Sequence, residues 1–313
     1  MMDVEKVRIT WAELPIQVRS AVESILGSPV TAADSQPGGY SPGSADRVRT
    51  AAGGRAFVKA VGLDLNPDSP GLHRREAAHT AKLPAAAPAP RLLGSYDDGD
   101  WVALVLEDVD GAHPSTPWTA ADVDAALLLL TDLAGTCTPC PVTDAPDFTE
   151  GLPANSDGWR RLADGRRDRL DPWAAAHLDL LTELAARGAE AAAGDTLLHA
   201  DVRADNLLRR PDGSMVLIDW PWASHGADWV DSMLLLGNIE LHGGHDVDAL
   251  LAAHPLTAAA DPADLTGFVA GMTAFFLDQA SQPPPPGLPT LRAFQRAQGD
   301  AHLRWLRRRV DVP

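Results

Sequence analysis

The stretch that decides the fold runs from Thr196 to Asp231 and reads TLLHADVRADNLLRRPDGSMVLIDWPWASHGADWVD. Pro211-Asp212-Gly213 lies in its middle and is a strong turn sequence, because proline and glycine favour the backbone angles of tight turns. Apolar residues flank this turn on both sides, at 207–208 and at 215–218. We therefore expect a β-hairpin across this turn.

Polar side chains lie at one end of the expected hairpin. Asn206 precedes its first strand and Asp219 follows its second, so the two would lie side by side. Amide and carboxylate oxygens are ligands that Mg²⁺ accepts, and a protein commonly supplies only one or two carboxylates beside the substrate phosphates. Asp201 lies five residues before Asn206, where its carboxylate could accept a proton from a hydroxyl. The alternative is a polar loop that closes an ordinary hairpin.

This arrangement resembles the catalytic segment of the kinase superfamily, and in particular that of the aminoglycoside phosphotransferase family. In protein kinases the catalytic loop has an Asp five residues before an Asn, and a later Asp binds metal. Asp201, Asn206 and Asp219 match this order, and His199 matches the first loop residue of the family. The resemblance implies that Asp201 deprotonates the acceptor hydroxyl and that Asn206 and Asp219 hold Mg²⁺.

The resemblance also implies the fold class. We expect an α+β, bilobal, protein-kinase-like fold with a small antiparallel β-sheet in the N-lobe and a mainly helical C-lobe. The N-lobe would cover residues 1–108 and bind the nucleotide with its sheet and one main helix. The C-lobe would cover residues 109–313 and carry the catalytic loop and the acceptor-binding helices. Further helices are expected at 120–134, 172–193, 261–280 and 290–309.

A lysine and a glutamate upstream strengthen the resemblance. Lys59 lies within an alternating, strand-like stretch and resembles the third-strand lysine that holds the α- and β-phosphates. Glu76 follows 17 residues later in an expected helix, as in the lysine–glutamate ion pair of the kinase fold. Lys59 is one of only three lysines in the chain, so it is not part of a general lysine surface. The alternative is a solvent-facing lysine on an edge strand.

A glycine-rich stretch at 36–44 lies between two expected strands, where a kinase fold places its loop over the nucleotide phosphates. Glycine lets backbone amides approach phosphates closely. Gly39, Ser41, Gly43 and Ser44 are the expected phosphate-facing residues. The stretch lacks the Gly-Lys-Ser/Thr of a Walker A loop and departs from G-x-G-x-x-G, but it looks like the looser loop of antibiotic kinases. A plain hairpin turn is the alternative.

The segment from Glu107 to Val109 resembles, by its position, the hinge between the lobes, where backbone groups would bind the adenine edge. Arg203 lies where protein kinases carry a lysine against the γ-phosphate. It could stabilise charge in the transition state, or it could form a salt bridge with Asp205 or another neighbour. Asp231 ends an element similar to the Gly-Asp-Pro-x-x-Asp of the family, and we expect it to cap the following helix and to brace the catalytic loop.

Composition excludes some classes of protein. The net charge of −17 argues against a nucleic-acid binder, and it is compatible with a cationic acceptor as well as with simple solubility. No apolar run approaches the roughly 20 residues of a membrane span, and the N-terminus lacks a signal-peptide core, so we expect a cytoplasmic protein without an evident obligate protein partner. Cys137 and Cys140 form a lone C-x-x-C without the further ligands of a zinc site.

The leading hypothesis is an O-phosphotransferase that depends on ATP or GTP and on Mg²⁺ and acts on a hydroxyl of a small molecule. An aminoglycoside or another antibiotic is the first candidate for this acceptor. Only eleven residues separate Asp219 from Asp231, which leaves no room for the activation segment of a protein kinase. A sugar or amino-alcohol kinase and an inactive nucleotide-binding scaffold are the alternatives. A third is a metal-dependent hydrolase that uses His199, Asp201 and Asp219.

Overall fold

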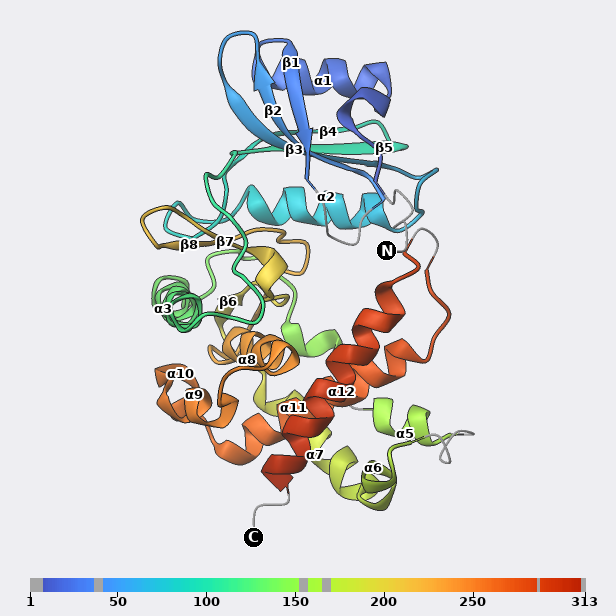
Figure 1. The fold of residues 1–313 in the computed structure, drawn as a ribbon, viewed down its shortest axis with the longest axis vertical. Helices are drawn as coiled ribbons and strands as arrows, with labels where there is room; N and C mark the ends of the chain where they lie inside the picture. Colours follow the sequence, from blue (N-terminus) through green and yellow to red (C-terminus); the bar gives the residue numbers. More distant parts are fainter. Residues whose placement is uncertain (1–7, 37–41, 152–156, 165–169, 286–287, 311–313) are drawn as a thin grey trace. The chain divides into compact units, whose positions relative to one another are not determined.

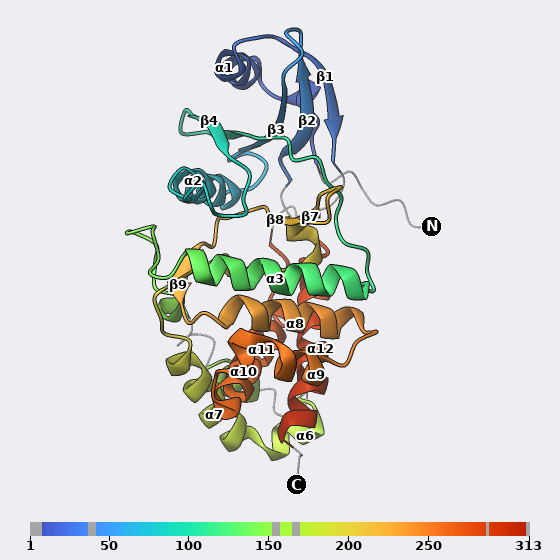
Figure 2. The same cartoon turned by 90° about the vertical axis from the view of Figure 1, so that its left-hand side faces the viewer.

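The computed structural model describes residues 8–36, 42–151, 157–164, 170–285 and 288–310. The chain divides into two compact units (Figures 1 and 2). The first comprises residues 1–113, 205–222 and 285–289, and the second comprises residues 114–204, 223–284 and 290–313. The first unit therefore contains the hairpin that follows residues 199–204 as well as the N-terminal sheet. The lobe boundary expected after residue 108 stays a prediction.

The first unit is built on a five-stranded antiparallel sheet in the order β1-β2-β3-β5-β4. Its strands are β1 (Val30–Ser35), β2 (Ser44–Thr50), β3 (Arg55–Gly62), β4 (Leu92–Asp97) and β5 (Trp101–Leu106). The helix α1 (Ile16–Leu26) packs on one face, where Val18 and Val22 join the apolar side chains of β2 and β3. The helix α2 (Ser69–Thr80) lies on the other face, where Ala77 packs against Val102, Leu104 and Leu106. Lys59 lies in β3, the central strand.

The predicted hairpin is present in the first unit. Strand β7 (Leu207–Arg209) pairs with β8 (Met215–Leu217), and Gly213 in the turn has a φ of +89°, which favours glycine. The hairpin also binds the segment that follows β5, because the backbones of Ala112 and Arg209 exchange hydrogen bonds of 3.1 and 2.8 Å. Gly111 permits this approach, since a Cβ there would lie 2.9 Å from the carbonyl oxygen of Arg209.

The second unit is mainly helical. Its helices are α3 (Ala120–Thr136), α5 (Gly158–Ala163), α6 (Pro172–Ala176), α7 (Leu178–Ala191), α8 (Val230–His242), α9 (Val247–Ala253), α10 (Pro255–Ala258), α11 (Pro262–Ala280) and α12 (Leu291–Val310). A two-stranded sheet of β6 (Thr196–Leu198) and β9 (Ser224–Gly226) completes it. Of the short 3-10 helices, η2 (Phe148–Gly151) belongs to this unit, η1 (Trp11–Glu13) to the first unit, and η4 (Ala204–Asn206) lies where the chain passes from the second unit to the first. The predicted fold class, an antiparallel sheet in the N-terminal part and a helical C-terminal part, is confirmed.

The prediction of one continuous helix at 172–193 is wrong. The stretch expected to be one helix at 172–193 is divided into α6 and α7 at His177, whose φ of −111° and ψ of 18° leave the helical region. The His177 ring is within hydrogen-bonding distance (2.8 Å) of the carbonyl of Trp173, four residues back. No proline or glycine marks this break in the sequence, so the apolar pattern alone does not reveal it.

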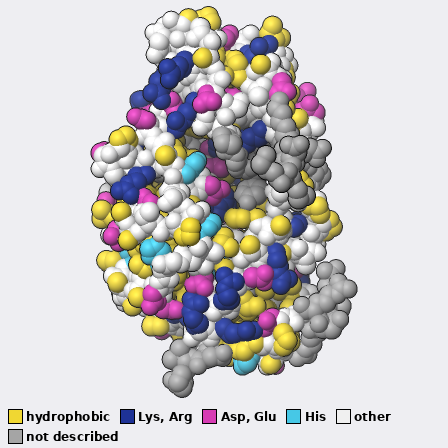
Figure 3. All heavy atoms as spheres, viewed as in Figure 1, with side chains coloured by type: hydrophobic (Ala, Val, Ile, Leu, Met, Phe, Trp, Pro, Cys, Tyr) yellow, Lys and Arg dark blue, Asp and Glu magenta, His cyan; other side chains and the backbone are white. Residues whose placement is uncertain are grey.

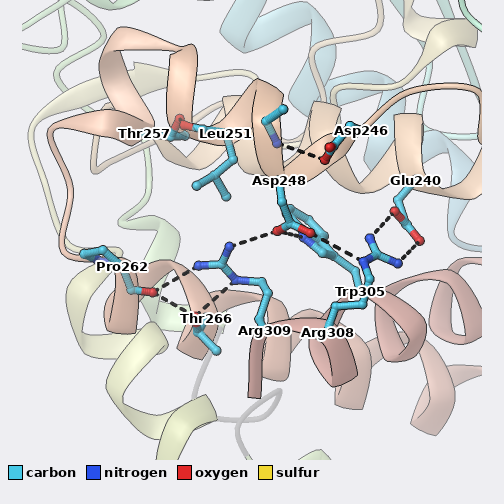
Figure 4. A network of polar contacts seen from close by, with 11 residues as sticks. Glu240, Asp246, Asp248, Leu251, Thr257, Pro262, Thr266, Trp305, Arg308 and Arg309 are labelled. Carbon is cyan, nitrogen blue, oxygen red and sulfur yellow. Dashed lines mark hydrogen bonds and ion pairs between the residues drawn. The ribbon is translucent and has the colours of Figure 1, made fainter. Parts of the chain in front are cut away.

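The C-terminal half of α12 is tied to three other helices by a polar network (Figure 4). Asp248 of α9 accepts hydrogen bonds from the Trp305 indole at 2.9 Å and from Arg309 at 3.2 Å. Arg308 forms a two-pronged contact with Glu240 of α8, at 3.0 and 2.7 Å. Figure 3 shows basic and acidic side chains intermixed over this part of the second unit. The basic side chains in the last turns of α12 thus pack against neighbouring helices. None of the helices in the described ranges has the length and apolar character needed to cross a membrane.

Close packing of α7 on α11 depends on two glycines. A Cβ added at Gly188 would lie 2.1 Å from the carbonyl carbon of Gly267, and one added at Gly267 would lie 2.4 Å from the Leu184 carbonyl oxygen. By contrast, a Cβ at Gly271, on the same helix α11, would meet its nearest atom, the Ala185 carbonyl oxygen, at 3.9 Å. The two helices therefore approach most closely at Gly188 and Gly267.

We expect Gly188→Ala to lower the free energy of unfolding by roughly 1–3 kcal/mol, because backbone atoms in its way cannot move aside as a side chain can. The matched control, Gly271→Ala, adds the same methyl group at an ordinary van der Waals distance from its nearest atom and should be neutral or stabilising by up to about 1 kcal/mol. Urea unfolding of both variants measures the difference. Equal stabilities would show that the helices do not pack this closely.

Candidate active site

Three charged side chains from distant parts of the sequence meet in the first unit. The Lys59 Nζ donates to both carboxylate oxygens of Glu76, each at 2.9 Å, and to Asp219 Oδ1 at 2.8 Å. Lys59 comes from β3 and Glu76 from α2, while Asp219 follows β8. The spacing of 17 residues between Lys59 and Glu76 therefore does correspond to an ion pair in the structure.

Burial and charge act against each other in this group. Burial disfavours the charged form of Lys59, but the carboxylates of Asp219 and Glu76 outweigh it and raise the pKa of the lysine. Burial also raises the pKa of Glu76, and the like charge of Asp219 raises it further. The positive charge of Lys59 lowers it, but by less. A buried ammonium group that stays charged needs such partners, because an unpaired buried charge is very costly.

Asp219 lies at a turn held by bonds on both sides. The Ile218 amide donates to the Asn206 carbonyl at 2.9 Å, so Asn206 and Asp219 lie at the same end of the β7–β8 hairpin. The ring of His79 on α2 is 3.1 Å from the carbonyl of Trp220. Asp219 itself has a φ of +69°, which costs energy in a residue other than glycine and is often found at functional sites.

The Asn206 and Asp219 side chains could hold Mg²⁺. Both present oxygen donors, the donor type that this ion takes, and the Asp219 side chain is 41% exposed, so a ligand can reach it. The Asn206 side chain is buried, within η4. In the described part of the chain no cluster of three His, Cys, Asp or Glu side chains is arranged to hold a metal. The donors thus suit a hard cation whose remaining ligands are phosphate and water.

Asp201 and Arg203 contact each other in the second unit. Arg203 Nη1 donates to Asp201 Oδ1 at 2.7 Å and to Oδ2 at 3.0 Å. The guanidinium also lies over the ring of Phe294, 5.5 Å from its centre. The sequence left two roles open for Arg203. The structure shows the second of these, a salt bridge with a neighbouring residue, and Asp201 is one of its partners. The contact fixes the orientation of the Asp201 carboxylate.

Asp231 braces the segment that carries Asp201. Its carboxylate accepts hydrogen bonds from the amides of His199 at 2.7 Å and Ala200 at 2.9 Å. Ala200 has a φ of +62°, so these bonds hold a backbone conformation that is unfavourable by itself. Burial raises the pKa of Asp231 to about 6, although the two amides favour its charged form. The prediction that Asp231 caps α8 is wrong: Trp229 is the N-cap, and Asp231 lies in the first turn.

The glycine-rich stretch is described only in part. Gly39 and Ser41 lie outside the described residues. A Cβ at Gly43 would lie 2.2 Å from the Ala60 carbonyl oxygen, so this glycine allows the chain to pass close to β3. Ser44 begins β2 and is buried. Both glycine and serine thus have structural roles here, and phosphate binding by these four residues stays a prediction.

The expected hinge is fixed by arginines. Glu107 forms a salt bridge of 3.1 Å with Arg91, and the Val109 carbonyl accepts a hydrogen bond of 3.2 Å from Arg47 Nη2. Arg47 also donates to the Gly111 carbonyl at 3.2 Å. Arg47 was not predicted from the sequence, where it is simply one residue of an alternating strand. Adenine binding at Glu107 and Val109 stays a prediction.

His73 is a second residue that the sequence did not single out. It is buried on α2, one turn before Glu76, and its Nδ1 is 3.2 Å from the Ser69 carbonyl. Burial, together with the charge of Lys59, lowers its pKa to about 4, so His73 is neutral near pH 7. His73 lies three residues before Glu76, so both side chains lie on one face of the helix. This spacing is the feature of the sequence that points to His73.

Comparison with known proteins gives the family. Residues 44–268 match the model of the phosphotransferase enzyme family. Among solved structures, the chain is similar to a thermostable mutant of aminoglycoside phosphotransferase APH(4)-Ia in ternary complex with ADP and hygromycin B. The identity is 15% and the TM-score 0.59, over 92% of this chain and 98% of that chain. No sequence among the curated proteins matches the chain significantly.

Two further structures have different acceptors. Spectinomycin phosphotransferase APH(9)-Ia, in complex with ADP and spectinomycin, is 13% identical with a TM-score of 0.58, and the match covers 96% of both chains. Choline kinase LicA from Streptococcus pneumoniae is 15% identical with a TM-score of 0.57, over 94% of this chain and 96% of that chain. At such identities the similarity shows the fold alone, which is protein-kinase-like.

The family match covers well over half of the chain, so the chain belongs to the phosphotransferase enzyme family. It is a small-molecule phosphotransferase that acts on hydroxyl groups. The alternative of a metal-dependent hydrolase that uses His199, Asp201 and Asp219 is therefore wrong.

The pKa of Asp231 gives a testable pH dependence. Because the pKa in the fold, about 6, lies above the ordinary 3.8, folding favours the protonated form. The contribution to stability is complete below about pH 4 and is lost as the pH rises through about 6. We expect the stability of the wild type relative to Asp231→Asn to fall by up to about 3 kcal/mol between about pH 4 and about pH 7. Urea unfolding across this range measures it, and a pH-independent difference would contradict the assignment.

Proposed function

We propose that this enzyme transfers the γ-phosphoryl group of ATP or GTP, with Mg²⁺, to a hydroxyl of an aminoglycoside or other antibiotic. The observation that carries the proposal is the group of Lys59, Glu76 and Asp219, in which one ammonium contacts two carboxylates from different segments at 2.8–2.9 Å. Phosphoryl transfer depends mostly on positioning and on neutralising charge. A largely buried lysine held by a glutamate, next to a carboxylate that would bind Mg²⁺, suits that task.

In the first unit, Lys59, oriented by Glu76, would hold the α- and β-phosphates. Asn206 and Asp219 would hold Mg²⁺, which supplies charge neutralisation across the phosphates when it is bound. Backbone groups at Glu107 and Val109 would bind the adenine or guanine edge. Gly39, Ser41, Gly43 and Ser44 would face the phosphates. The structures of related fold, which include complexes with ADP, support a nucleotide as the donor.

In the second unit, Asp201 would orient the acceptor hydroxyl and finally take its proton. Arg203, already bonded to both Asp201 oxygens, would hold this carboxylate in place and add positive charge where the transferred group carries negative charge. Asp231 would keep the segment in its strained conformation through the His199 and Ala200 amides. The cytoplasm, where nucleoside triphosphates are available, is the compartment that this reaction requires.

The net charge and the related structures support the proposed acceptor class. Hygromycin B, spectinomycin and choline, named with those structures, each carry a hydroxyl and a basic or quaternary nitrogen. The net charge of −17 favours such a cationic acceptor through long-range attraction. The choline kinase keeps an amino-alcohol acceptor as the second candidate.

A panel assay tests the proposal. Radiolabelled ATP and GTP would be offered with Mg²⁺ and hygromycin B, spectinomycin, choline, other aminoglycosides and simple sugars. We expect Mg²⁺-dependent labelling of at least one hydroxylated cationic acceptor, and an antibiotic as the best substrate. If choline or a sugar is the best substrate, the acceptor is a metabolite and not an antibiotic. Nucleotide binding without transfer to any member would favour the inactive scaffold and would contradict the proposal.

Replacement of Asp201 tests its role as the base. We expect Asp201→Asn to lower kcat on the order of 100-fold or more, because an amide cannot take the proton, while the affinity for Mg²⁺-nucleotide stays within about twofold. The matched control is Asp228→Asn, the same chemical change at an exposed residue, which should leave kcat unchanged. Steady-state kinetics and nucleotide titration measure both. Full activity of Asp201→Asn would remove Asp201 as the base.

A further inference from the structure

The helix α8 presents two polar side chains to the segment that carries Asp201. Asp231 and Asn238 are seven residues apart, so they lie on nearly the same face of the helix, about 10 Å apart along its axis. Asp231 accepts from the amides of His199 and Ala200, at the start of the segment. Asn238 accepts from the amide of Ala204, at its end. The helix thus contacts both ends of the segment.

Asn238 is held in one orientation. Its Oδ1 accepts from the Ala204 amide at 3.3 Å and from the Trp118 indole Nε1 at 3.3 Å. Because both partners can only donate, the atom that faces them must be the amide oxygen. Asn238 and Trp118 are both buried, and the Trp118 carbonyl is 2.9 Å from His245 Nε2. A buried polar residue with two fixed donors has little freedom to turn.

Asp201 and Arg203 lie between these two attachment points. Asp201 is joined to the start of the segment by its own amide, which donates to His199 Nδ1 at 3.2 Å. The other end depends on Ala204, whose buried amide has Asn238 as its acceptor. Loss of that acceptor leaves a buried N–H without a partner, which the chain can relieve only by moving. Such a movement would displace the carboxylate that must meet a hydroxyl within a small tolerance.

We propose that Asn238 is a positioning residue for phosphoryl transfer, which acts by holding Ala204 and, through it, Asp201. This inference rests on the proposed function, because it requires Asp201 to act on the acceptor. Asn238 itself touches no reacting group, so its effect should appear in kcat and in the dynamics of the segment. The affinity for the nucleotide should not depend on it.

The test compares three variants. Asn238→Leu has a similar volume but no acceptor, and Asn238→Asp keeps an oxygen in the same position. Ser232→Ala is the matched control, because it removes a buried hydrogen bond on the same helix, the 2.8 Å contact with His254 Nε2, without touching the segment. For each full-length variant, the measurements are kcat and KM for ATP with the best acceptor of the panel, and hydrogen exchange of the Ala204 amide by NMR.

We expect Asn238→Leu to lower kcat about tenfold, to leave KM for ATP within about twofold, and to speed exchange of the Ala204 amide on the order of tenfold. Asn238→Asp should recover most of the kcat and of the protection of the amide. Ser232→Ala should keep both, even if its melting temperature falls as far as that of Asn238→Leu.

Unchanged kcat and unchanged Ala204 exchange in Asn238→Leu would overturn the inference. An equal loss of kcat in Asn238→Leu and Ser232→Ala would overturn it too, since the effect would then be one of general stability. If the wild type transfers phosphate to no acceptor, the proposed function fails instead. Faster exchange at Ala204 in Asn238→Leu would then still show the bracing contact, so the two failures are distinguishable.

Discussion

The contact of one largely buried ammonium group with two carboxylates is the interaction on which the first unit depends. The Lys59 side chain is only 15% exposed, and it stays charged there because Glu76 and Asp219 both lie within 2.9 Å of its Nζ. This requirement joins the central strand, the helix α2 and the hairpin β7–β8, although the three residues are far apart in the sequence. The same three side chains are those that a nucleotide and its metal would need, so stability and proposed function rest on one set of contacts.

In the second unit, the constraint on which the proposed site depends is one on the backbone. The segment from His199 to Ala204 departs from regular structure, with a φ of +62° at Ala200, and it keeps this conformation through side chains of α8. Apolar burial contributes as well, because Val202 is buried between its partly buried neighbours Asp201 and Arg203. The helix acts as a rigid support, and the residues proposed for catalysis are placed on a short irregular segment that it holds.

Local spacing made much of this predictable from the sequence. The Pro211-Asp212-Gly213 turn between apolar runs predicted the hairpin. The resemblance of Lys59 and Glu76, 17 residues apart, to the lysine–glutamate pair of the kinase fold predicted the ion pair. Contacts between residues distant in sequence were not predictable. The Arg47 contact with the Val109 carbonyl and the Asn238 contact with the Ala204 amide depend on packing that no periodic pattern encodes. The break at His177 was missed because no residue nearby disfavours a helix.

The most direct test of the central claim is a calorimetric titration of Mg²⁺-ATP and Mg²⁺-GTP into the wild type, Lys59→Ala and Lys82→Ala. Lys82 is an exposed lysine of the same unit and serves as the matched control. We expect Lys59→Ala to weaken binding of the preferred nucleotide at least about tenfold, since a charged phosphate contact is lost, and Lys82→Ala to bind as the wild type does. Equal affinity in all three proteins would contradict it.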